Sequence, residues 1–566
     1  MKYLIPFCLM AVTSFAQIQY PKDYFRLPLN IPLELSGCFG ELRNNHFHSG
    51  FDIKTQQREG LPVFAVAEGY VSRIKIATFG YGKAIYVTHP NGFTTVYGHL
   101  SKGYGKIEKK IKKMQYKQEL YEVDFFLKPD ELPIQKNDTI AFSGNTGGSG
   151  GPHLHFEFRE TATEKILNPM LFGFDQYIKD HKKPILNNVL IYPIDEKSVV
   201  NQSNMPIIAN LTLQKDGSYW SDKVLASGKL GFAINAYDMF STGYNKYGVY
   251  KVVLKNNEKP LFSYQFDGFT FDQFRYINAF LDYNKLQKSN QRYQKLFMKT
   301  PFDLKLIETD SDHGMITTND AEQNTTYTIE ISDIHQNTTR VKIPVMFDVL
   351  PVKNNQMPDP SPYFINQKRE QIFEKDQVEV TFPKGVFYDN FNMNFQVSKD
   401  TLTLHNKYTP VHQYFSIKWK LENPAFKDLS KVFIAQVEGR KLDYLETTLK
   451  NNVLYAKSRE LGTYVLAQDT IAPKIGIAKS IEGKNIARQK NITLTISDNL
   501  SGIKTFHGYL NNQWILFEYE YKNKSIVYQF DDRLQEGENK LKVIVTDYVG
   551  NSTTFETSFQ YQVRPE

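Results

Sequence analysis

The sequence predicts a mainly β protein that is built from several modules. Its 566 residues exceed what one hydrophobic core normally serves, so three or four domains are expected. The chain holds 35 tyrosines and 41 phenylalanines, and aromatic side chains favour strands over helices. From about residue 185 onward, short alternating strands are separated by turns of Asn, Asp and Gly, a pattern typical of β-sandwiches.

The first residues have the features of a secretory signal peptide. Lys2 supplies a positive charge, and the short apolar core that follows ends at the small residue Ala16. We expect cleavage after Ala16, which removes residues 1–16 and leaves a mature protein in the periplasm or outside the cell. The apolar run is too short to span a membrane, and no later stretch is long enough, so no membrane span is predicted.

The cysteine content and the charge indicate that the mature chain has no internal disulfide and is not a nucleic-acid binder. Cys8 leaves with the signal peptide, so Cys38 is the single thiol of the mature chain and no internal disulfide is predicted. We interpret Cys38 as a small buried apolar residue rather than a reactive thiol. The 68 Lys and Arg nearly balance the 61 Asp and Glu. The predicted surface is therefore only mildly basic, without the concentrated positive charge of a nucleic-acid binder.

Residues 17–174 form the first predicted domain, and short strands run through it. Residues 84–89 and 93–99 flank a Pro-Asn-Gly turn, which is a strong hairpin signal. Residues 101–135 interrupt the strand pattern as a partly helical insertion. There Ile107, Ile111 and Met114 share one helical stripe with lysines elsewhere, so a helix with a solvated face is expected.

A glycine-rich loop at residues 144–151 leads into an alternating segment. His153, His155 and Glu157 alternate with apolar residues, so they lie on one face of a predicted strand. The glycines allow positive φ angles and a close approach of the backbone to a ligand. Alone, this stretch fits a binding site and a surface strand equally well.

Metal chemistry is suggested once the other histidines are considered. Zinc accepts imidazole nitrogen and carboxylate oxygen, and three protein ligands leave a fourth position for a water molecule. His48, Asp52 and His155 would supply such a set, and zinc makes a bound water acidic near neutral pH. His99 and His153 then remain as imidazoles near that water, suited to taking its proton and stabilising the oxyanion of an attacked amide.

Four segments together resemble the lysostaphin/LytM-type M23 metallopeptidases: His48-x-Gly50-x-Asp52, Tyr97-Gly-His99-Leu, Ser143-Gly-Asn-Thr-Gly147 and His153-Leu-His155. The resemblance covers roughly residues 35–173. It implies a small antiparallel β-sheet with a groove, zinc (Zn²⁺) bound by His48, Asp52 and His155, and His99 and His153 as catalytic residues. It also implies cross-links or stem peptides of peptidoglycan as substrates. The insertion at 101–135 departs from the family pattern and would alter a wall of the groove.

The predicted function is therefore that of an exported zinc metalloendopeptidase acting on peptidoglycan peptides. One alternative is a non-catalytic LytM-type activator of other wall hydrolases, which the filled ligand positions argue against. A second is an exported peptidase that acts on glycine-rich proteins, and a third is an adhesin or scaffold based on the β modules.

The remaining chain is predicted as an Ig-like β-sandwich at 175–350, an all-β module at 351–471 and a second Ig-like β-sandwich at 472–566. A faint internal repeat relates Asp238 and Asp333 in the former sandwich to Asp498 and Asp547 in the latter. Because the dense ligand spacing of a calcium loop is missing, these aspartates are interpreted as turn caps.

Three further residues near the site are assigned or left open. His89 follows a strand and precedes a Pro-Asn-Gly turn, so we expect an exposed side chain. Glu157 either orients a metal ligand or faces water. Tyr97, on the same strand face as His99, either contacts substrate or packs in the core.

Overall fold

The computed structural model describes residues 20–241, 243–355, 361–422 and 426–562. It is mainly β, with 46% strand and 9% helix, which confirms the predicted fold class. The predicted signal peptide at residues 1–16 lies outside the described residues. Within the described part of the chain, no helix combines the length and apolarity needed to cross a membrane.

An antiparallel sheet forms the centre of the N-terminal unit, residues 20–174. Its strands lie in the order β1 (Leu35–Gly37), β4 (Phe51–Lys54), β13 (His153–Glu160), β8 (Phe93–Gly98), β7 (Lys83–Thr88), β6 (Gly69–Ile76) and β10 (Val123–Phe126). Shorter strands surround it: β2 (Leu42–Arg43), β3 (His46–Phe47), β5 (Pro62–Phe64), β9 (Lys102–Gly103), β11 (Pro133–Ile134), β12 (Thr139–Phe142) and β14 (Ile166–Leu167). The pairing of β7 with β8 confirms the predicted hairpin.

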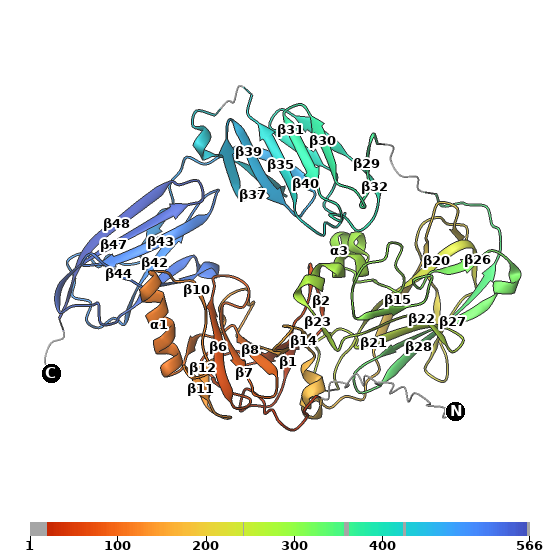
Figure 1. Ribbon diagram of the computed structural model, residues 1–566, viewed down its shortest axis with the longest axis horizontal. Helices are drawn as coiled ribbons and strands as arrows, with labels where there is room; N and C mark the ends of the chain where they lie inside the picture. The colour runs from red at the N-terminus through yellow and green to blue at the C-terminus, as the bar shows by residue number, and fades with distance from the viewer. Residues whose placement is uncertain (1–19, 242, 356–360, 423–425, 563–566) are drawn as a thin grey trace, which may run out of the picture.

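The insertion at 101–135 contains the helix α1 (Lys106–Gln118). Ile107 and Ile111 are buried and Met114 is half-buried, as the apolar stripe predicts, while most of the lysines face away from the core. Two short 3-10 helices close the unit, η1 (Pro169–Phe172) and η2 (Phe174–Tyr177). The insertion therefore adds a helix at one side of the sheet (Figure 1).

The second unit, residues 175–350, is built on one large sheet. The strands of its main path are β17 (Ile207–Ile208), β15 (Ile185–Pro193), β20 (Val224–Tyr237), β28 (Thr338–Phe347), β27 (Thr325–Ser332), β21 (Lys251–Asn256), β22 (Lys259–Gln265) and β25 (Ile307–Thr309). Branches add β16 (Val199–Val200), β18 (Leu211–Leu213), β19 (Tyr219–Ser221), β24 (Gln294–Lys295) and β26 (Ile316–Thr318). The helical segments are η3 (Phe271–Tyr276), α2 (Ile277–Phe280), α3 (Tyr283–Ser289) and η4 (Ala321–Gln323).

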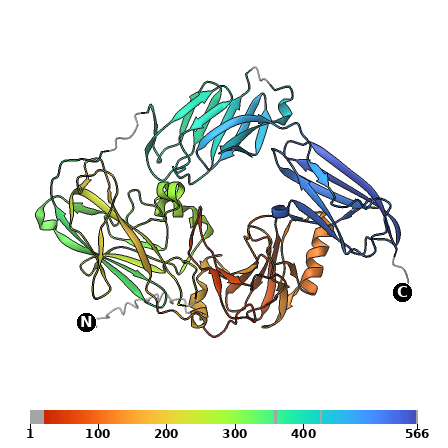
Figure 2. The ribbon, with the colours of Figure 1, turned by 180° about the vertical axis from the view of Figure 1, so that it is seen from behind.

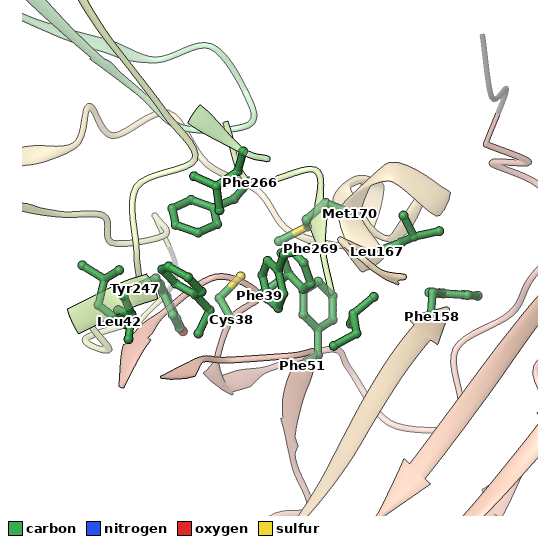
Figure 3. Close-up of a cluster of buried hydrophobic side chains, with 14 of the residues drawn as sticks. Cys38, Phe39, Leu42, Phe51, Phe158, Leu167, Met170, Tyr247, Phe266 and Phe269 are labelled. Atoms are coloured by element: carbon green, nitrogen blue, oxygen red, sulfur yellow. The ribbon is translucent and has the colours of Figure 1, made fainter. Parts of the chain in front are cut away.

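The N-terminal and second units share one hydrophobic core. Strand β14 pairs with β23 (Gly268–Phe269) across the predicted boundary at 174/175. Phe39 stacks on Phe269, and Cys38 is buried in the same cluster, as predicted for its thiol (Figure 3). Because apolar side chains of both units interlock here, a fragment that ends at residue 174 would expose this surface to water.

The third and C-terminal units each consist of two facing sheets around a core. In the third unit, residues 361–469, one sheet holds β30 (Gln371–Lys375), β31 (Val378–Phe382), β35 (Phe415–Lys420), β39 (Val453–Ser458) and β38 (Thr447–Lys450), and the other holds β33 (Phe395–Ser398), β34 (Thr401–Leu404), β40 (Gly462–Gln468), β36 (Val432–Glu438) and β37 (Lys441–Tyr444). The pair β29 (Tyr363–Ile365) and β32 (Phe391–Met393) and the turn η5 (Leu429–Lys431) complete it.

In the C-terminal unit, residues 470–562, the first sheet holds β41 (Lys474–Gly476), β42 (Asn491–Ser497), β46 (Ser525–Gln529) and β45 (Phe517–Glu520). The second sheet holds β44 (Gln513–Ile515), β43 (Ile503–Leu510), β47 (Gly537–Asp547) and β48 (Ser552–Tyr561), and the turn η6 (Tyr521–Asn523) lies between β45 and β46. One apolar core lies between the two sheets.

The four units are arranged as a ring in which the last unit returns to the first (Figure 1 and Figure 2). Tyr116 of α1 contacts Trp514 edge-on at 5.2 Å between ring centroids. Lys83 Nζ lies 2.6 Å from Glu518 Oε2 in a largely buried ion pair. Lys522 Nζ donates to the carbonyl of Ser149 at 3.3 Å, so the C-terminal unit contacts the glycine-rich loop directly.

Candidate active site

The three predicted metal ligands converge on one point of the N-terminal sheet. His155 on β13 lies directly opposite Asp52 on β4, and His48 follows β3. Asp52 Oδ1 is 3.0 Å from His48 Nε2 and 2.9 Å from His155 Nδ1, and the two imidazole nitrogens are 3.3 Å apart. The sheet register thus brings together side chains that are up to 107 residues apart in sequence.

Each of these side chains is fixed by a second partner on its far side. His48 Nδ1 donates to the carbonyl of Cys38 at 2.7 Å, so its Nε2 presents a lone pair. His155 Nε2 donates to Glu157 Oε1 at 2.8 Å, so Nδ1 is the ring nitrogen that faces Asp52. Arg43 Nη2 donates to Asp52 Oδ2 at 2.6 Å and leaves Oδ1 to face the histidines.

This set fits a metal ion. Two imidazole nitrogens and one carboxylate oxygen, all atoms that can ligate a metal, face one another within 3.3 Å and are shielded from solvent, an arrangement that a cation stabilises. Burial lowers the pKa of His48 to about 4, so its imidazole is neutral at pH 7, as a ligand must be. Burial also acts to lower the pKa of His155, but its bonds to Asp52 and Glu157 outweigh burial and raise that pKa to about 9. The site therefore favours positive charge between these two carboxylates.

Glu157 is a supporting residue of the site rather than a surface carboxylate. Its side chain is 0% exposed and accepts hydrogen bonds from Ser49 Oγ at 2.6 Å and from the Tyr81 hydroxyl. Arg159 Nε donates to Glu157 Oε2 at 2.8 Å. Burial raises the pKa of Glu157, but Arg159 and His155 outweigh it and hold the pKa well below the usual range. Glu157 is thus an anchored anion that orients the His155 ring.

His99 and His153 lie beside the ligand set with their rings 4.7 Å apart. Each donates from Nδ1 to a backbone carbonyl at 2.8 Å, His99 to Thr146 and His153 to Gly151. Both Nε2 atoms are therefore proton acceptors, and that of His153 is 3.4 Å from Asp52 Oδ1. His99 adopts a φ of 57°, a left-handed conformation that non-glycine residues take at a cost of about 1–3 kcal/mol and mostly at functional sites.

The glycine-rich loop has two parts with different surroundings. A Cβ on Gly147 would lie 2.3 Å from the Gly82 nitrogen, and its φ is 71°, so this position requires glycine. Gly150 and Gly151 face open space instead. They line a groove of about 670 Å³ that is bounded opposite by residues between 31 and 36 and that reaches Asp52 and His153.

A scan of family models identifies this part of the chain. Residues 46–116, which include His48, Asp52 and His99, match the model of Peptidase family M23. The chain carries an M23 peptidase domain. Residues 362–469, in the third unit, match the model of a Zu5-like domain.

Two curated relatives each match about a quarter of the chain. An uncharacterized metalloprotease of Haemophilus influenzae is 31% identical over 155 residues, which are 26% of this chain and 27% of the relative. The peptidoglycan DD-endopeptidase ShyC of Vibrio cholerae is 28% identical over 144 residues, 25% of this chain and 27% of the relative. The chain thus spans about a quarter of the length of these relatives.

Among solved structures, the catalytic domain of lysostaphin from Staphylococcus simulans matches with 23% identity and a TM-score of 0.19. The match covers 25% of this chain and 92% of that domain.

Two residues near the M23 site are now placed. Tyr97 is fully buried, and its hydroxyl accepts from Val66 N and Thr95 Oγ1, so it packs in the core. The prediction that His89 is exposed is wrong, because His89 is 3% exposed. Its ring bonds to the Glu68 carbonyl at 2.7 Å and to Thr95 Oγ1 at 2.8 Å, and two internal partners make burial of an imidazole favourable.

Other residues of the M23 domain were missed by the sequence reasoning. Ser49 and Tyr81 reach Glu157 through local turns that carry no sequence signal. Arg159 had one, because it continues the two-residue alternation of the His153 strand on the same face. The insertion at 101–135 does not line the groove at Asp52 and His153, contrary to expectation, and α1 instead contacts the C-terminal unit.

Proposed function

We propose that this protein is an exported zinc endopeptidase that hydrolyses amide bonds in the peptides of peptidoglycan. The observation that carries the proposal is the convergence of His48 Nε2, Asp52 Oδ1 and His155 Nδ1, with two further imidazoles beside them. The M23 domain and the name of the Vibrio cholerae relative support the substrate class.

The chemistry that zinc supplies in such a ligand set is Lewis acidity toward a water molecule and a scissile carbonyl. Glu157 and Arg43 hold the side chains of His155 and Asp52, which would ligate the ion, in a fixed orientation. His99 and His153 present their Nε2 atoms beside the candidate ligand set. We assign to them the acceptance of a proton from the water and, once protonated, the stabilisation of the oxyanion.

The groove beside Asp52 and His153 supports an extended peptide as substrate. Gly150 and Gly151 carry no side chain that would keep a peptide backbone away from this wall. Lys54 and Glu34 on the groove offer one charge of each sign, which suits a peptide that carries both amino and carboxyl groups.

The test is mass spectrometry of products from defined cross-linked muropeptides incubated with zinc-loaded, full-length protein. His99→Ala and His153→Ala should each lower turnover by about 10²- to 10⁴-fold, the usual range for a lost general acid or base. Both variants should keep one zinc per chain, whereas His48→Ala should lose the metal as well. The control is His46→Ala, because His46 is two residues from His48 and its ring bonds to the Asn44 carbonyl and lies near Phe274, away from the candidate ligands.

The outcomes separate the alternatives. If the wild type binds zinc but, like His99→Ala, releases no product, the proposal of an enzyme is refuted. A protein that holds no zinc yet raises the activity of another wall hydrolase favours the non-catalytic activator. Cleavage of a glycine-rich protein in place of muropeptides favours the second peptidase hypothesis. N-terminal sequencing of secreted or periplasmic protein tests export, with Gln17 as the expected first residue.

A further inference from the structure

Two buried clusters of aspartates lie far from the M23 site. In the second unit, ligand atoms of Asp180, Asp333 and His335 lie within 4.8 Å of one another. Those of Asp469, the last residue of the third unit, and of Asp498 and Asp547 in the C-terminal unit do so as well. We call these groups the Asp180 cluster and the Asp469 cluster. The spacing along the chain is far wider than in a contiguous calcium loop, which is why the repeated aspartates were interpreted as turn caps.

The two clusters are built in the same way. Asp180 precedes β15 and Asp469 precedes β41, and each is followed four residues later by a proline. Asp333 follows β27 and accepts the Asn337 amides on both carboxylate oxygens, at 2.8 and 2.7 Å.

In the Asp469 cluster, Asp547 at the end of β47 accepts the Asn551 amides in the same way, at 2.7 and 2.8 Å. The Asn551 side chain also donates to the Asp469 carbonyl at 3.0 Å, as that of Asn337 does to the Asp180 carbonyl.

Asp238 lies near the Asp180 cluster, at the strand end that corresponds to that of Asp498 in the Asp469 cluster. Asp238 follows β20, which pairs with β15, and Asp498 follows β42, which pairs with β41. The charges of Asp333 and Asp180 act on Asp238. Burial and these two neighbours raise the pKa of Asp238 to about 7. Each cluster therefore gathers carboxylates from three separate segments of its unit.

Several of these oxygen atoms lack any partner. Asp180 is 4% exposed and Asp238 is 3% exposed, yet Asp180 Oδ2 and Asp238 Oδ1 are buried without a hydrogen bond. Asp498 Oδ1 is likewise buried and unpartnered. Among the described residues, none of the six aspartates forms an ion pair with Lys or Arg, and the Lys182 ammonium donates to the Phe240 carbonyl instead. Burying a carboxylate without a partner costs free energy. A bound cation would supply a partner for the free oxygen atoms and would neutralise the unpaired charges.

The ligand chemistry favours a hard cation. The two clusters share carboxylate oxygens, which Ca²⁺ and Mg²⁺ prefer, whereas a nitrogen ligand is available only from His335, and Val549 occupies the equivalent position. Ca²⁺ tolerates the irregular geometry that three independent segments impose, while Mg²⁺ demands near-ideal octahedral coordination. We propose that the Asp180 and Asp469 clusters are two equivalent calcium sites.

Both sites lie at junctions between units. Asp469 directly follows β40, the last strand of the third unit, and Leu500 and Val549 from the neighbouring loops pack against Phe433 of that unit. Asp238 pairs by backbone with Tyr247, whose hydroxyl donates to the Leu35 carbonyl in β1 of the N-terminal unit at 3.0 Å. Calcium at these positions fixes the loops that hold one unit against the next.

The test is calcium binding by the zinc-loaded full-length protein, measured by equilibrium dialysis and by thermal unfolding with and without calcium. We expect two calcium ions per chain, with dissociation constants below about 1 mM, and an unfolding temperature that rises with calcium but not with equimolar magnesium. Asp238→Asn and Asp498→Asn should each lose one of the two ions. Asp312→Asn, an exposed carboxylate of the second unit, is the control and should keep both.

A second measurement guards against simple misfolding. In chelator, Asp238→Asn should unfold at the same or a higher temperature than the wild type, because the substitution removes one of several repelling buried charges. The proposal is overturned if the wild type binds no calcium up to about 10 mM, a range that includes weak extracellular sites, or if both variants still bind two ions. Equal binding and stabilisation by magnesium would overturn the assignment to calcium.

Discussion

Glu157→Gln tests whether a buried anion supports His155, a candidate metal ligand. The substitution preserves shape but removes the charge that accepts hydrogen bonds from His155, Ser49 and Tyr81. It also leaves the buried Arg159 guanidinium, which lies 2.7 Å from Glu157 Oε2, without its main counter-ion. Removing one partner of a buried pair typically destabilises a protein by about 3–5 kcal/mol. Arg159 retains Glu164 at 3.0 Å, so we expect the lower end, about 3 kcal/mol.

The same change should weaken zinc binding. Loss of a partner behind a ligating histidine typically lowers metal affinity by about 10- to 100-fold. Competition with a chromophoric chelator measures this affinity, and denaturant unfolding of the zinc-free protein measures stability. The matched control is Glu164→Gln, because Glu164 pairs with the same arginine at an exposed position, where a pair contributes about 0–1 kcal/mol. If Glu157→Gln and Glu164→Gln have the same stability and zinc affinity, the supporting role of Glu157 is refuted.

The other predictions concern acid stability, the loop and the ring contact. Because burial lowers the pKa of His89 to about 4 from about 6.5, its contribution to stability is complete above pH 6.5 and is lost as the pH falls toward 4. His89→Gln should make the free energy of unfolding depend less steeply on pH between 4 and 6.5. An unchanged pH dependence would contradict the role given to His89. Gly147→Ala should lower peptidase turnover more than tenfold, whereas Gly150→Ala, in open space, should change it less than twofold; equal effects in a kinetic assay would refute the argument. Glu518→Gln removes the counter-ion of the largely buried Lys83, so limited proteolysis should cut near residue 470 faster than in the wild type, and an unchanged rate would argue against this contact.

The candidate metal ligands were predictable because zinc chemistry restricts the residue types. His48, Asp52 and His155 stand out as the imidazole and carboxylate groups of short motifs in a fixed order. The partners that hold these three side chains in place could not be predicted from the sequence. The carbonyl of Cys38 and the guanidinium of Arg43 become partners only through turns and sheet register. The mainly β class was equally accessible, since alternation with a period of two is a local property of the chain.

Features that depend on distant contacts were not predictable. Lys83 and Glu518 are 435 residues apart, and the local sequence around either residue does not indicate that they form an ion pair. The prediction for His89 failed because a turn sequence predicts exposure of the turn, not of the side chain beside it. Asp238 and Asp498 were interpreted as turn caps from their local sequence, and Asp498 Oδ2 does cap its turn, because it accepts from Leu500 N at 3.0 Å and Gly502 N at 2.8 Å. The burial of Asp238, and the closeness of Asp498 to Asp469 and Asp547, result from strand pairing across the whole unit.

The ring closure has a thermodynamic consequence for the contact between the first and last units. Because the second and third units tether them, their association is unimolecular, and the relevant quantity is an effective concentration, which reaches the millimolar range for short flexible connections. A few contacts such as Lys83–Glu518 and Tyr116–Trp514 then suffice to keep the contact closed. The same pair of surfaces on separate chains at micromolar concentration would remain mostly apart. The contact of the C-terminal unit with the glycine-rich loop therefore depends on the covalent connection through the second and third units. A separate copy of the C-terminal unit added in solution would not replace it.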